Sequence, residues 1–294
     1  MVAKQTVALE DQRVQQEKPS PSDRPFLGRS VERLEDAALL TGRGAFIDDL
    51  GVKPGTLFAA FVRSPLAHAR IVKVDVGAAL TMPGVAAVLT GAELAKATRP
   101  FTVGVKAPMQ HYALAVDRVR YVGEPVAIVC AGTPYLAEDA AALVELQFDP
   151  LPAIVDPLAA MAAAAPLLHP VAGSNTISDR TFTYGAPAQA FAMADRIVDI
   201  TVRYPRNSVT PIECCGVIAA YDPGEDAYDV TANFQGPFAV HPVMALALGV
   251  PANRLRLKTP PDSGGSFGTK QGLFPYIVAL CVLARKAGRP VKWI

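Results

Sequence analysis

The residues with the clearest potential for chemistry lie in one run, Asp262 to Gln271, with the sequence DSGGSFGTKQ. Three glycines within five residues leave little bulk around one aromatic side chain, Phe267. Glycine persists where φ is positive or where another group must approach the backbone closely. Such a run can present successive N–H groups to an anion beside a helix start, and the apolar stretch Leu273–Ala284 predicts that helix. The run therefore predicts a binding loop.

Two nucleotide-binding motifs fit this run poorly. Gly268-Thr269-Lys270 lacks the adjacent Gly-Lys-Ser/Thr of a P-loop, and no G-x-G-x-x-G dinucleotide fingerprint occurs in the run. From the residues alone, an α+β domain that binds a phosphate compound at the glycines stays open.

Other residue types that could do chemistry are scattered along the chain. Glu213 lies among apolar residues, which predicts partial burial, a raised pKa and a structural or hydrogen-bonding role. The four cysteines are Cys130, Cys214, Cys215 and Cys281. They form no C-x-x-C pair, so we expect neither a zinc site nor an iron–sulfur cluster on this chain alone. The four histidines are His68, His111, His169 and His241. Each stands singly, which favours surface or capping positions over metal ligation.

Composition indicates a globular protein. The chain has 294 residues, of which 51% are apolar and 19% are charged, with a formal net charge of +1. This length suits about two domains, and a near-neutral charge argues against nucleic acid as a partner. The first 25 residues are polar and lack the apolar core of a secretory signal. Apolar stretches fall short of the ~20 residues of a membrane span, so we expect no span and a cytoplasmic location.

Alternating and helical patterns predict a mixed fold. Strands are predicted near residues 55–63, 69–76, 85–90, 125–131, 144–148, 197–204, 216–221, 228–233, 255–257 and from 291. Helices are predicted near residues 30–40, 135–143, 238–248 and 273–284, with a short one ending at 191–195. Turn residues at 222–226 favour a hairpin between two of these strands. We therefore predict the α+β class, with helices that cover at least one face of each sheet.

Seven short segments have distinctive residue combinations. They are Gly28-Arg29-Ser30 with Leu40-Thr41-Gly42-Arg43-Gly44; Phe61-Val62-Arg63-Ser64-Pro65; Tyr121-Val122-Gly123-Glu124-Pro125-Val126-Ala127; Pro211-Ile212-Glu213; Phe234-Gln235-Gly236-Pro237-Phe238; and Gly264-Gly265-Ser266-Phe267-Gly268. In their order and spacing, from about residue 26 onward, they resemble the molybdenum-binding large subunit of the xanthine dehydrogenase, aldehyde oxidase and carbon monoxide dehydrogenase family.

The resemblance implies a domain plan. Residues 1–25 are expected to form a flexible tail, residues 26–160 an α/β hammerhead domain, residues 161–177 a linker and residues 178–294 part of a molybdopterin-binding domain. The family's second cofactor-binding domain and its glutamate base have no counterpart in this sequence. We therefore expect no catalytic residue within this chain, and we expect a missing part or a partner chain to supply the base.

The same resemblance implies a cofactor and its contacts. The cofactor is molybdopterin with molybdenum, and whether the pterin is the cytosine dinucleotide form stays open. The residues expected to bind the cofactor are Gln235, Gly265, Ser266, Phe267 and Gly268. Phe267 and Gln271 are the candidates for the substrate pocket, and no residue of this chain is expected to bind the metal directly.

Gln235 has two readings. By resemblance, its amide would donate to an oxo ligand of the metal, and the Gly268 N–H would approach an oxo group. From the residues alone, Gln235 is a glutamine at a strand end that caps backbone groups in the turn before Pro237.

The implied activity is the hydroxylation of an aldehyde or heteroaromatic carbon with water. The implied partners are a chain with the rest of the molybdopterin-binding region, an Fe–S small subunit, an FAD medium subunit and a small-molecule substrate. Gln271 stands where the purine-oxidising branch has a glutamate, which disfavours purine hydroxylation. The chain is expected to be inactive without its partners. The alternative is a non-catalytic structural or assembly component of such a complex.

Overall fold

The computed structural model describes residues 26, 28, 30–102, 109–204 and 209–294. The chain divides into two compact units, residues 1–44 and 45–294. In the first unit, helix α1 (Asp36–Leu40) is shorter than the predicted helix over 30–40. None of its residues is buried, so it lacks the tertiary packing that stabilises most short helices. The predicted tail, residues 1–25, lies outside the described residues.

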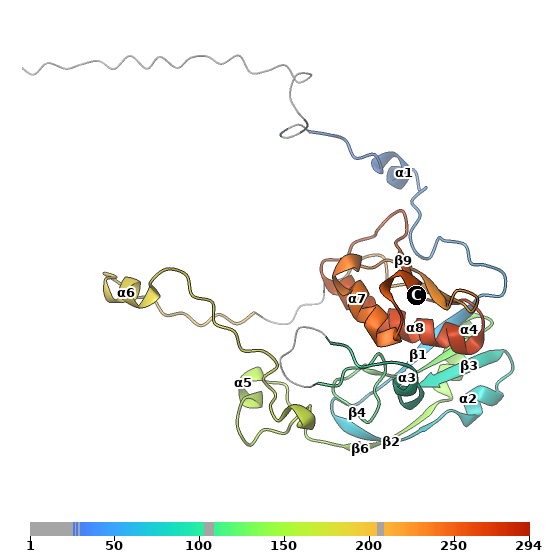
Figure 1. The fold of residues 1–294 in the computed structure, drawn as a ribbon, viewed down its shortest axis with the longest axis horizontal. Coiled ribbons are helices and arrows are strands. Elements are labelled where there is room, and N and C mark those ends of the chain that lie inside the picture. Colours follow the sequence, from blue (N-terminus) through green and yellow to red (C-terminus); the bar gives the residue numbers. More distant parts are fainter. Residues whose placement is uncertain (1–25, 27, 29, 103–108, 205–208) are drawn as a thin grey trace, which may run out of the picture. The chain divides into compact units, whose positions relative to one another are not determined.

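The second unit mixes strands and helices, as Figure 1 shows. Its strands are β1 (Leu57–Arg63), β2 (Ala69–Asp75), β3 (Val85–Thr90), β4 (Arg118–Val119), β5 (Pro125–Ala131), β6 (Glu145–Pro150), β7 (Val217–Asp222), β8 (Ala227–Ala232), β9 (Leu255–Lys258) and β10 (Val291–Trp293). Its α-helices are α2 (Gly77–Thr81), α3 (Gly91–Ala97), α4 (Pro134–Ala142), α5 (Pro157–Ala160), α6 (Pro187–Ala192), α7 (Pro237–Leu248) and α8 (Phe274–Ala287). Short 3₁₀ turns are η1 (Pro170–Ala172), η2 (Ala252–Arg254) and η3 (Thr269–Leu273). The predicted α+β class is confirmed.

One sheet combines strands from both predicted domains. Its order is β3-β5-β1-β10-β7-β8-β9, while β4-β2-β6 form a smaller sheet. The short strand β10 lies in the middle, parallel to β1 and antiparallel to β7. The backbone groups of this apolar strand therefore have a neighbour on each side. The domain bounds 26–160 and 178–294 stay a prediction, since strands from both sides of 161–177 share this sheet.

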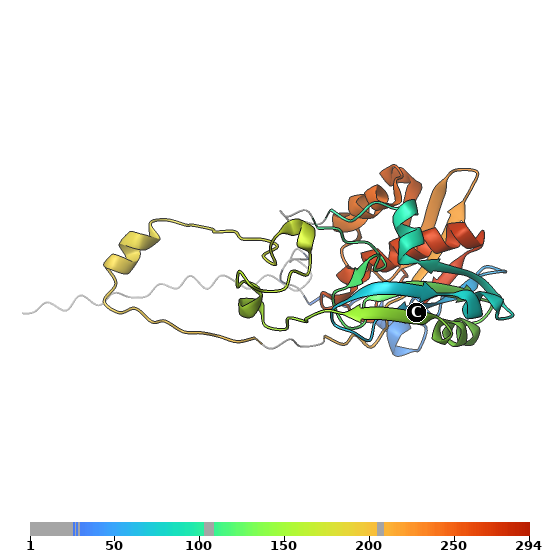
Figure 2. The ribbon, with the colours of Figure 1, turned by 90° about the horizontal axis from the view of Figure 1, so that it is seen from below.

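The core lies on both faces of the large sheet. Along β5, Ile128 and Cys130 pack in the cluster that includes α8, while Ala127 and Val129 pack toward α4. Figure 2 shows α8 in red and α4 in green on opposite sides of the strands. Every residue of β5 is buried, as expected for a strand with both faces covered.

Two helix ends show why the glycine positions terminate helices. Gly249 follows α7 with φ 71°, and Gly288 follows α8 with φ 63°. Both adopt the left-handed conformation that a helix C-cap favours and that glycine adopts without a steric penalty. The predicted stop of the helix at Gly249 is therefore confirmed.

The predicted strand over 197–204 is wrong. This segment has no strand, and every residue from 176 to 204 is exposed. Its residues alternate between apolar and polar, but a strand also requires a neighbour that accepts and donates its backbone hydrogen bonds. No such ladder forms here within the described part of the chain.

No helix of the described residues combines the length and the apolar character that a membrane crossing demands.

Candidate functional site

Gln235 and the glycine-rich run meet because of the sheet topology. Gln235 follows β8, and the run follows β9. These two strands are parallel neighbours, so their carboxyl ends lie at the same edge of the sheet. At this edge the Gln235 Oε1 accepts hydrogen bonds from the Gly268 N–H (2.8 Å) and the Ser266 hydroxyl (2.5 Å). Gln235, Ser266 and Gly268, which the sequence predicted to belong to one site, are thus in direct contact. Gln235 and Gly268 lie 33 positions apart in the sequence.

The three glycines of the run serve two purposes. Gly265 has φ 99° and Gly268 has φ 94°, and between them Phe267 also has a positive φ of 50°. A Cβ atom on Gly264 would instead lie 2.3 Å from the Cβ of Glu213. The run therefore needs glycine for left-handed backbone at two positions and for close packing at a third. Both reasons were the ones expected from the sequence.

The outer surface of the run is open. The Phe267 side chain is 72% exposed, and a Cβ atom on Gly268 would meet no atom within 4 Å. Gln235 is also exposed. Both of its described hydrogen bonds use Oε1, which leaves the Nε2 group as the donor of this side chain. An open loop with a neutral amide donor fits an anionic cofactor such as molybdopterin.

The structure gives Gln235 a capping role, but at the Gly268 N–H of the glycine-rich run and not in the turn before Pro237, and it changes the role of Gly268. The Gly268 N–H donates to Gln235, so in this structure it is not directed at a bound group. The Oε1 of Gln235 fixes the loop, while Nε2 stays available to a ligand. The two readings of Gln235 are therefore compatible, because they use different atoms.

A carboxylate lies beneath the start of the run. Glu213 accepts hydrogen bonds from Ile47 N–H, Gly264 N–H and the Lys270 ammonium group. Burial by itself would raise the pKa of Glu213, but the hydrogen bond from Lys270, with those from the two backbone N–H groups, lowers it below its ordinary value. The expected raised pKa of Glu213 is wrong, because the sequence did not show its cationic partner.

This arrangement weakens the phosphate reading of the run. Two of its N–H groups, those of Gly264 and Gly268, donate to Glu213 and Gln235. A phosphate site needs such groups to converge on the anion, and here a carboxylate already occupies one of them.

Gln271 lies on η3, directly after the run. Its N–H donates to the Gly268 carbonyl at 3.2 Å, and the residue is exposed. Its place in a substrate pocket stays a prediction.

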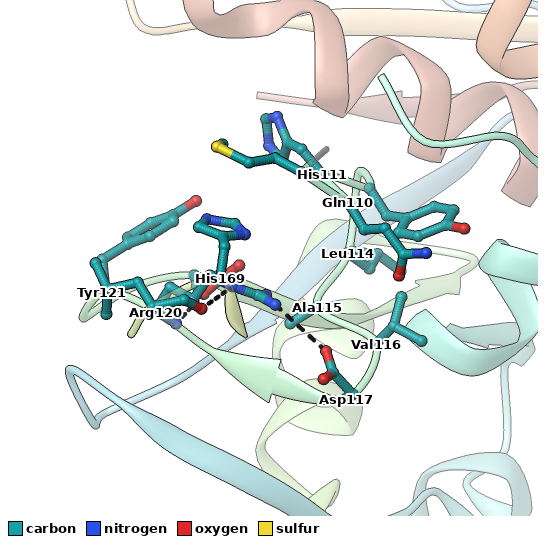
Figure 3. A pocket seen from close by; sticks show the side chains of 13 residues that line it. Gln110, His111, Leu114, Ala115, Val116, Asp117, Arg120, Tyr121 and His169 are labelled. Carbon is teal, nitrogen blue, oxygen red and sulfur yellow. Dashed lines mark hydrogen bonds and ion pairs between the residues drawn. The ribbon is translucent and has the colours of Figure 1, made fainter. Parts of the chain in front are cut away.

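A second concave region lies away from the glycine-rich run in sequence. It is a pocket of about 470 Å³ lined by residues of the predicted hammerhead domain and by Leu168 and His169 of the predicted linker. Figure 3 shows Arg120 reaching toward Asp117, with Tyr121 and His169 beside it. Arg120 donates to the Leu168 carbonyl (3.1 Å) and lies 3.5 Å from the Asp117 carboxylate. The sequence does not reveal this pocket, because its walls come from segments near residues 109–124 and 168–169 that share no motif.

Burial shifts the pKa values of three ionisable groups in this pocket, His111, His169 and Glu124, toward their neutral forms. Burial, with the charge of Arg120, lowers the pKa of His111, and the same causes together with His111 lower the pKa of His169 to about 4. Burial raises the pKa of Glu124, although backbone hydrogen bonds oppose it. At neutral pH both imidazoles are therefore uncharged and can act as donors or acceptors.

The histidine and cysteine predictions have mixed outcomes. The prediction of a surface position is wrong for His68, which is 4% exposed. Its Nδ1 lies 2.8 Å from the Pro152 carbonyl, just beyond the first β2–β6 pair, Ala69 with Pro150. Cys130 and Cys281 are buried, and burial raises both thiol pKa values. In the described ranges, no group of three or more His, Cys, Asp or Glu side chains could hold a metal ion.

Two known families match different parts of the chain. Residues 41–152 match the family described as aldehyde oxidase and xanthine dehydrogenase, a/b hammerhead domain. Residues 168–294 match the molybdopterin cofactor-binding domain.

Individual proteins give the same result. The chain is 36% identical over 273 residues to the carbon monoxide dehydrogenase large chain of Hydrogenophaga pseudoflava, covering 88% of this chain and 34% of that protein. It is 35% identical over 282 residues to the nicotine 6-hydroxylase large subunit of Paenarthrobacter nicotinovorans, with 93% and 34% covered. Among solved structures, quinoline 2-oxidoreductase from Pseudomonas putida 86 matches with a TM-score of 0.81 and 35% identity, over 90% of this chain and 34% of that one. The chain thus spans about one third of the length of these relatives.

Proposed function

Because the chain belongs to the aldehyde oxidase and xanthine dehydrogenase family, we propose that it forms one wall of a molybdopterin site in a multi-subunit molybdenum hydroxylase. This enzyme would hydroxylate an aldehyde or heteroaromatic carbon with oxygen from water and pass the electrons to other subunits. One observation supports the proposal most directly. The glutamine and the glycine-rich run expected to bind the cofactor lie together at an open edge of the sheet.

The cofactor supplies a Lewis-acidic metal that accepts electrons and activates water, which the protein groups cannot do themselves. The residues of this chain would bind and orient it. Gln235 would direct its Nε2 group toward an oxygen of the cofactor, since Oε1 is held by Ser266 and Gly268. A neutral donor adds no charge beside an anionic group. Gly268 would let the cofactor approach the backbone, because a Cβ atom there would meet no atom within 4 Å, whereas the Phe267 ring lies beside Gly265.

The substrate class rests on two residues. Phe267 presents an exposed ring on the loop, suited to contact with a flat or small apolar substrate. Gln271, also exposed, cannot act as a charged acceptor or a general base. We therefore favour an aldehyde or a neutral heterocycle over a purine. The names of two relatives, nicotine 6-hydroxylase and quinoline 2-oxidoreductase, are compatible with this choice.

The proposed complex includes further protein parts. Since the relatives are about three times as long as the matched region, we propose that the rest of the molybdopterin-binding region, including the glutamate base, is supplied outside the residues present here. Fe–S clusters and FAD would reside on partner subunits, and the pterin could be molybdopterin or its cytosine dinucleotide. We place the complex in the cytoplasm, and we propose that the chain alone is inactive.

Metal and pterin analysis of the purified complex tests this function. We expect molybdenum and pterin to co-purify in equal amounts with the subunit that contains this chain. We also expect Gln235→Ala to lower molybdenum content and turnover together. Gln189→Ala, on helix α6, is the matched control, since Gln189 lies outside the proposed site. Unchanged molybdenum content and turnover in Gln235→Ala would favour the non-catalytic alternative. A complex that contains no molybdopterin would refute the proposal.

A further inference from the structure

We propose that Glu213 is a positioning residue that closes the glycine-rich run into a loop of fixed shape. It does so by binding Gly264, near the beginning of the run, and Lys270, near its end, with one carboxylate oxygen. The ordering of the loop does not depend on the proposed function. Only the consequence for cofactor binding rests on that function.

The contacts of Glu213 come from two distant segments, the glycine-rich run and the residues around Ile47. Its Oε2 accepts the Gly264 N–H at 3.0 Å and the Lys270 Nζ at 2.5 Å. Its Oε1 accepts the Ile47 N–H at 3.1 Å. The partners lie 51, 57 and 166 positions away from Glu213 along the sequence. Since Gly264 and Lys270 share one oxygen, the residues between them form a closed loop across a single atom.

A second set of hydrogen bonds aligns the start of the run. The Asp262 carboxylate accepts the Ala45 N–H at 2.7 Å, and the Asp262 N–H donates to the Ala45 carbonyl at 3.2 Å. The Glu213 N–H donates to the Gly264 carbonyl at 3.4 Å. Gly264 fits only because it has no Cβ, which would lie 2.3 Å from the Glu213 side chain. The run is thus held at its beginning by backbone, side chain and close packing together.

The free part of the loop faces the proposed site. Ser266 and Gly268, which lie between the two fixed ends, donate to Gln235. If the ends separate, Gln235 loses the geometry that directs its Nε2 group. Closing a loop at both ends reduces the conformations open to the residues between them, so the fixed ends determine the shape of the middle.

Burial distinguishes this ion pair from an ordinary surface contact. The Lys270 side chain is 1% exposed and that of Glu213 is 9% exposed. A buried pair contributes little net stability compared with apolar residues of the same volume, but removing one partner alone leaves an unpaired buried charge. The effects on stability and on loop shape can therefore be separated. Replacing both residues leaves no unpaired buried charge, but it removes the contacts of Glu213 that hold the loop.

Hydrogen exchange on the full 294-residue chain tests the proposal. The variants are Glu213→Leu, Lys270→Met and the double variant, each measured for thermal midpoint and for amide exchange over residues 264–268. We expect Glu213→Leu to lower the midpoint and to speed exchange in the loop about tenfold or more, as for the loss of hydrogen bonds to a charged group. We expect the double variant to recover most of the midpoint while exchange in the loop stays fast.

The control is a second lysine–glutamate pair of similar length. Lys286 and Glu93 lie 2.7 Å apart, with both side chains substantially exposed. Glu93→Leu should leave exchange over 264–268 at the wild-type rate. If the double variant restores both the midpoint and slow exchange, Glu213 has only a structural role and the proposal is wrong. If Glu213→Leu does not fold, the double variant alone decides between these outcomes.

The cofactor readout separates this proposal from the proposed function. In the assembled complex, the double variant should retain the partner subunits but contain less molybdenum than wild type. Fast loop exchange in the chain, combined with a wild-type complex that lacks molybdopterin, would preserve the positioning role and refute the function. Slow loop exchange in the double variant, combined with a wild-type complex that contains molybdenum, would refute the positioning role and support the function.

Discussion

Strand β5 and the segment 197–204 are both rich in Val and Ile, yet only β5 forms a strand. β5 has the sequence PVAIVCA, and all of its residues are buried. The segment 197–204 has the sequence IVDITVRY, and all of its residues are exposed. β5 lies between β3 and β1 and is covered by helices on both faces. The segment 197–204 belongs to neither sheet of the described chain. The comparison shows that β-propensity becomes a strand only where backbone partners and a covering layer exist.

The same principle explains β10. This three-residue strand is shorter than the segment 197–204, yet it forms because β1 and β7 flank it. Whether a strand forms here therefore depends less on segment length and sequence pattern than on the presence of a neighbouring strand on each side.

The largest effect should come from the centre of the sheet. Ile128 is 0% exposed in β5, so Ile128→Ala should destabilise the chain by about 2–5 kcal/mol through lost burial and a residual cavity. Ile128→Val, which removes one methyl group, should cost only about 0.5–1.5 kcal/mol. Denaturant unfolding measures both. Equal effects for the two variants would mean that β5 is not the packed centre that its burial indicates.

An intermediate effect is expected at the edge of the sheet. Gln235→Ala removes two exposed hydrogen bonds to the glycine-rich run, which should cost about 0.5–1.5 kcal/mol. Gln271→Ala, an exposed glutamine in the neighbouring turn, should change the unfolding free energy by less than about 0.5 kcal/mol. A Gln235 effect as small as that of Gln271 would show that the Oε1 contacts do not hold the loop.

A pH-dependent effect, reduced by the partial exposure of His169 to solvent, should arise at the pocket of Figure 3. Burial and the charges of Arg120 and His111 lower the pKa of His169 from 6.5 to about 4, while Asp117 opposes this. Between these values the unfolded state binds a proton that the folded state does not, so stability falls as the pH is lowered through this window. This loss of stability is absent above the pKa of the unfolded state and reaches a constant value below the pKa of the folded state.

Denaturant midpoints measured across that window check this sign. We expect wild type to lose more stability on acidification than His169→Gln, which cannot bind the proton. Parallel pH profiles for the two proteins would show that His169 is not buried enough to shift its pKa.

The smallest effect is expected in the exposed segment. Ile200 is 76% exposed, so Ile200→Ser should change the unfolding free energy of the chain by less than about 0.5 kcal/mol. The matched Ile128→Ser change should rank among the most damaging, because it buries a hydroxyl group as well as creating a cavity. A loss above about 1 kcal/mol in Ile200→Ser would contradict the comparison, since it would require packing of this segment within the chain.

Local patterns determined much of the fold. The hairpin β7–β8, helices α7 and α8 and the strands β1, β3 and β5 were predicted from periodicity and turn residues, because these signals act over a few neighbouring positions. The glycine run and Gln235 were also recognised from the sequence, and glycine conformations were expected at the positions where φ is positive. The family followed from the order of short segments along the chain.

Only the tertiary structure determined which groups lie next to one another in space. The pairing of Glu213 with Lys270 reverses the expected pKa shift, and no local signal joins residues 57 positions apart. The pocket between His111 and His169, and the central position of β10, likewise depend on how distant segments pack. Sequence patterns report the preferences of each segment, whereas burial, charge pairing and strand partners are properties of neighbours that only the folded chain brings together.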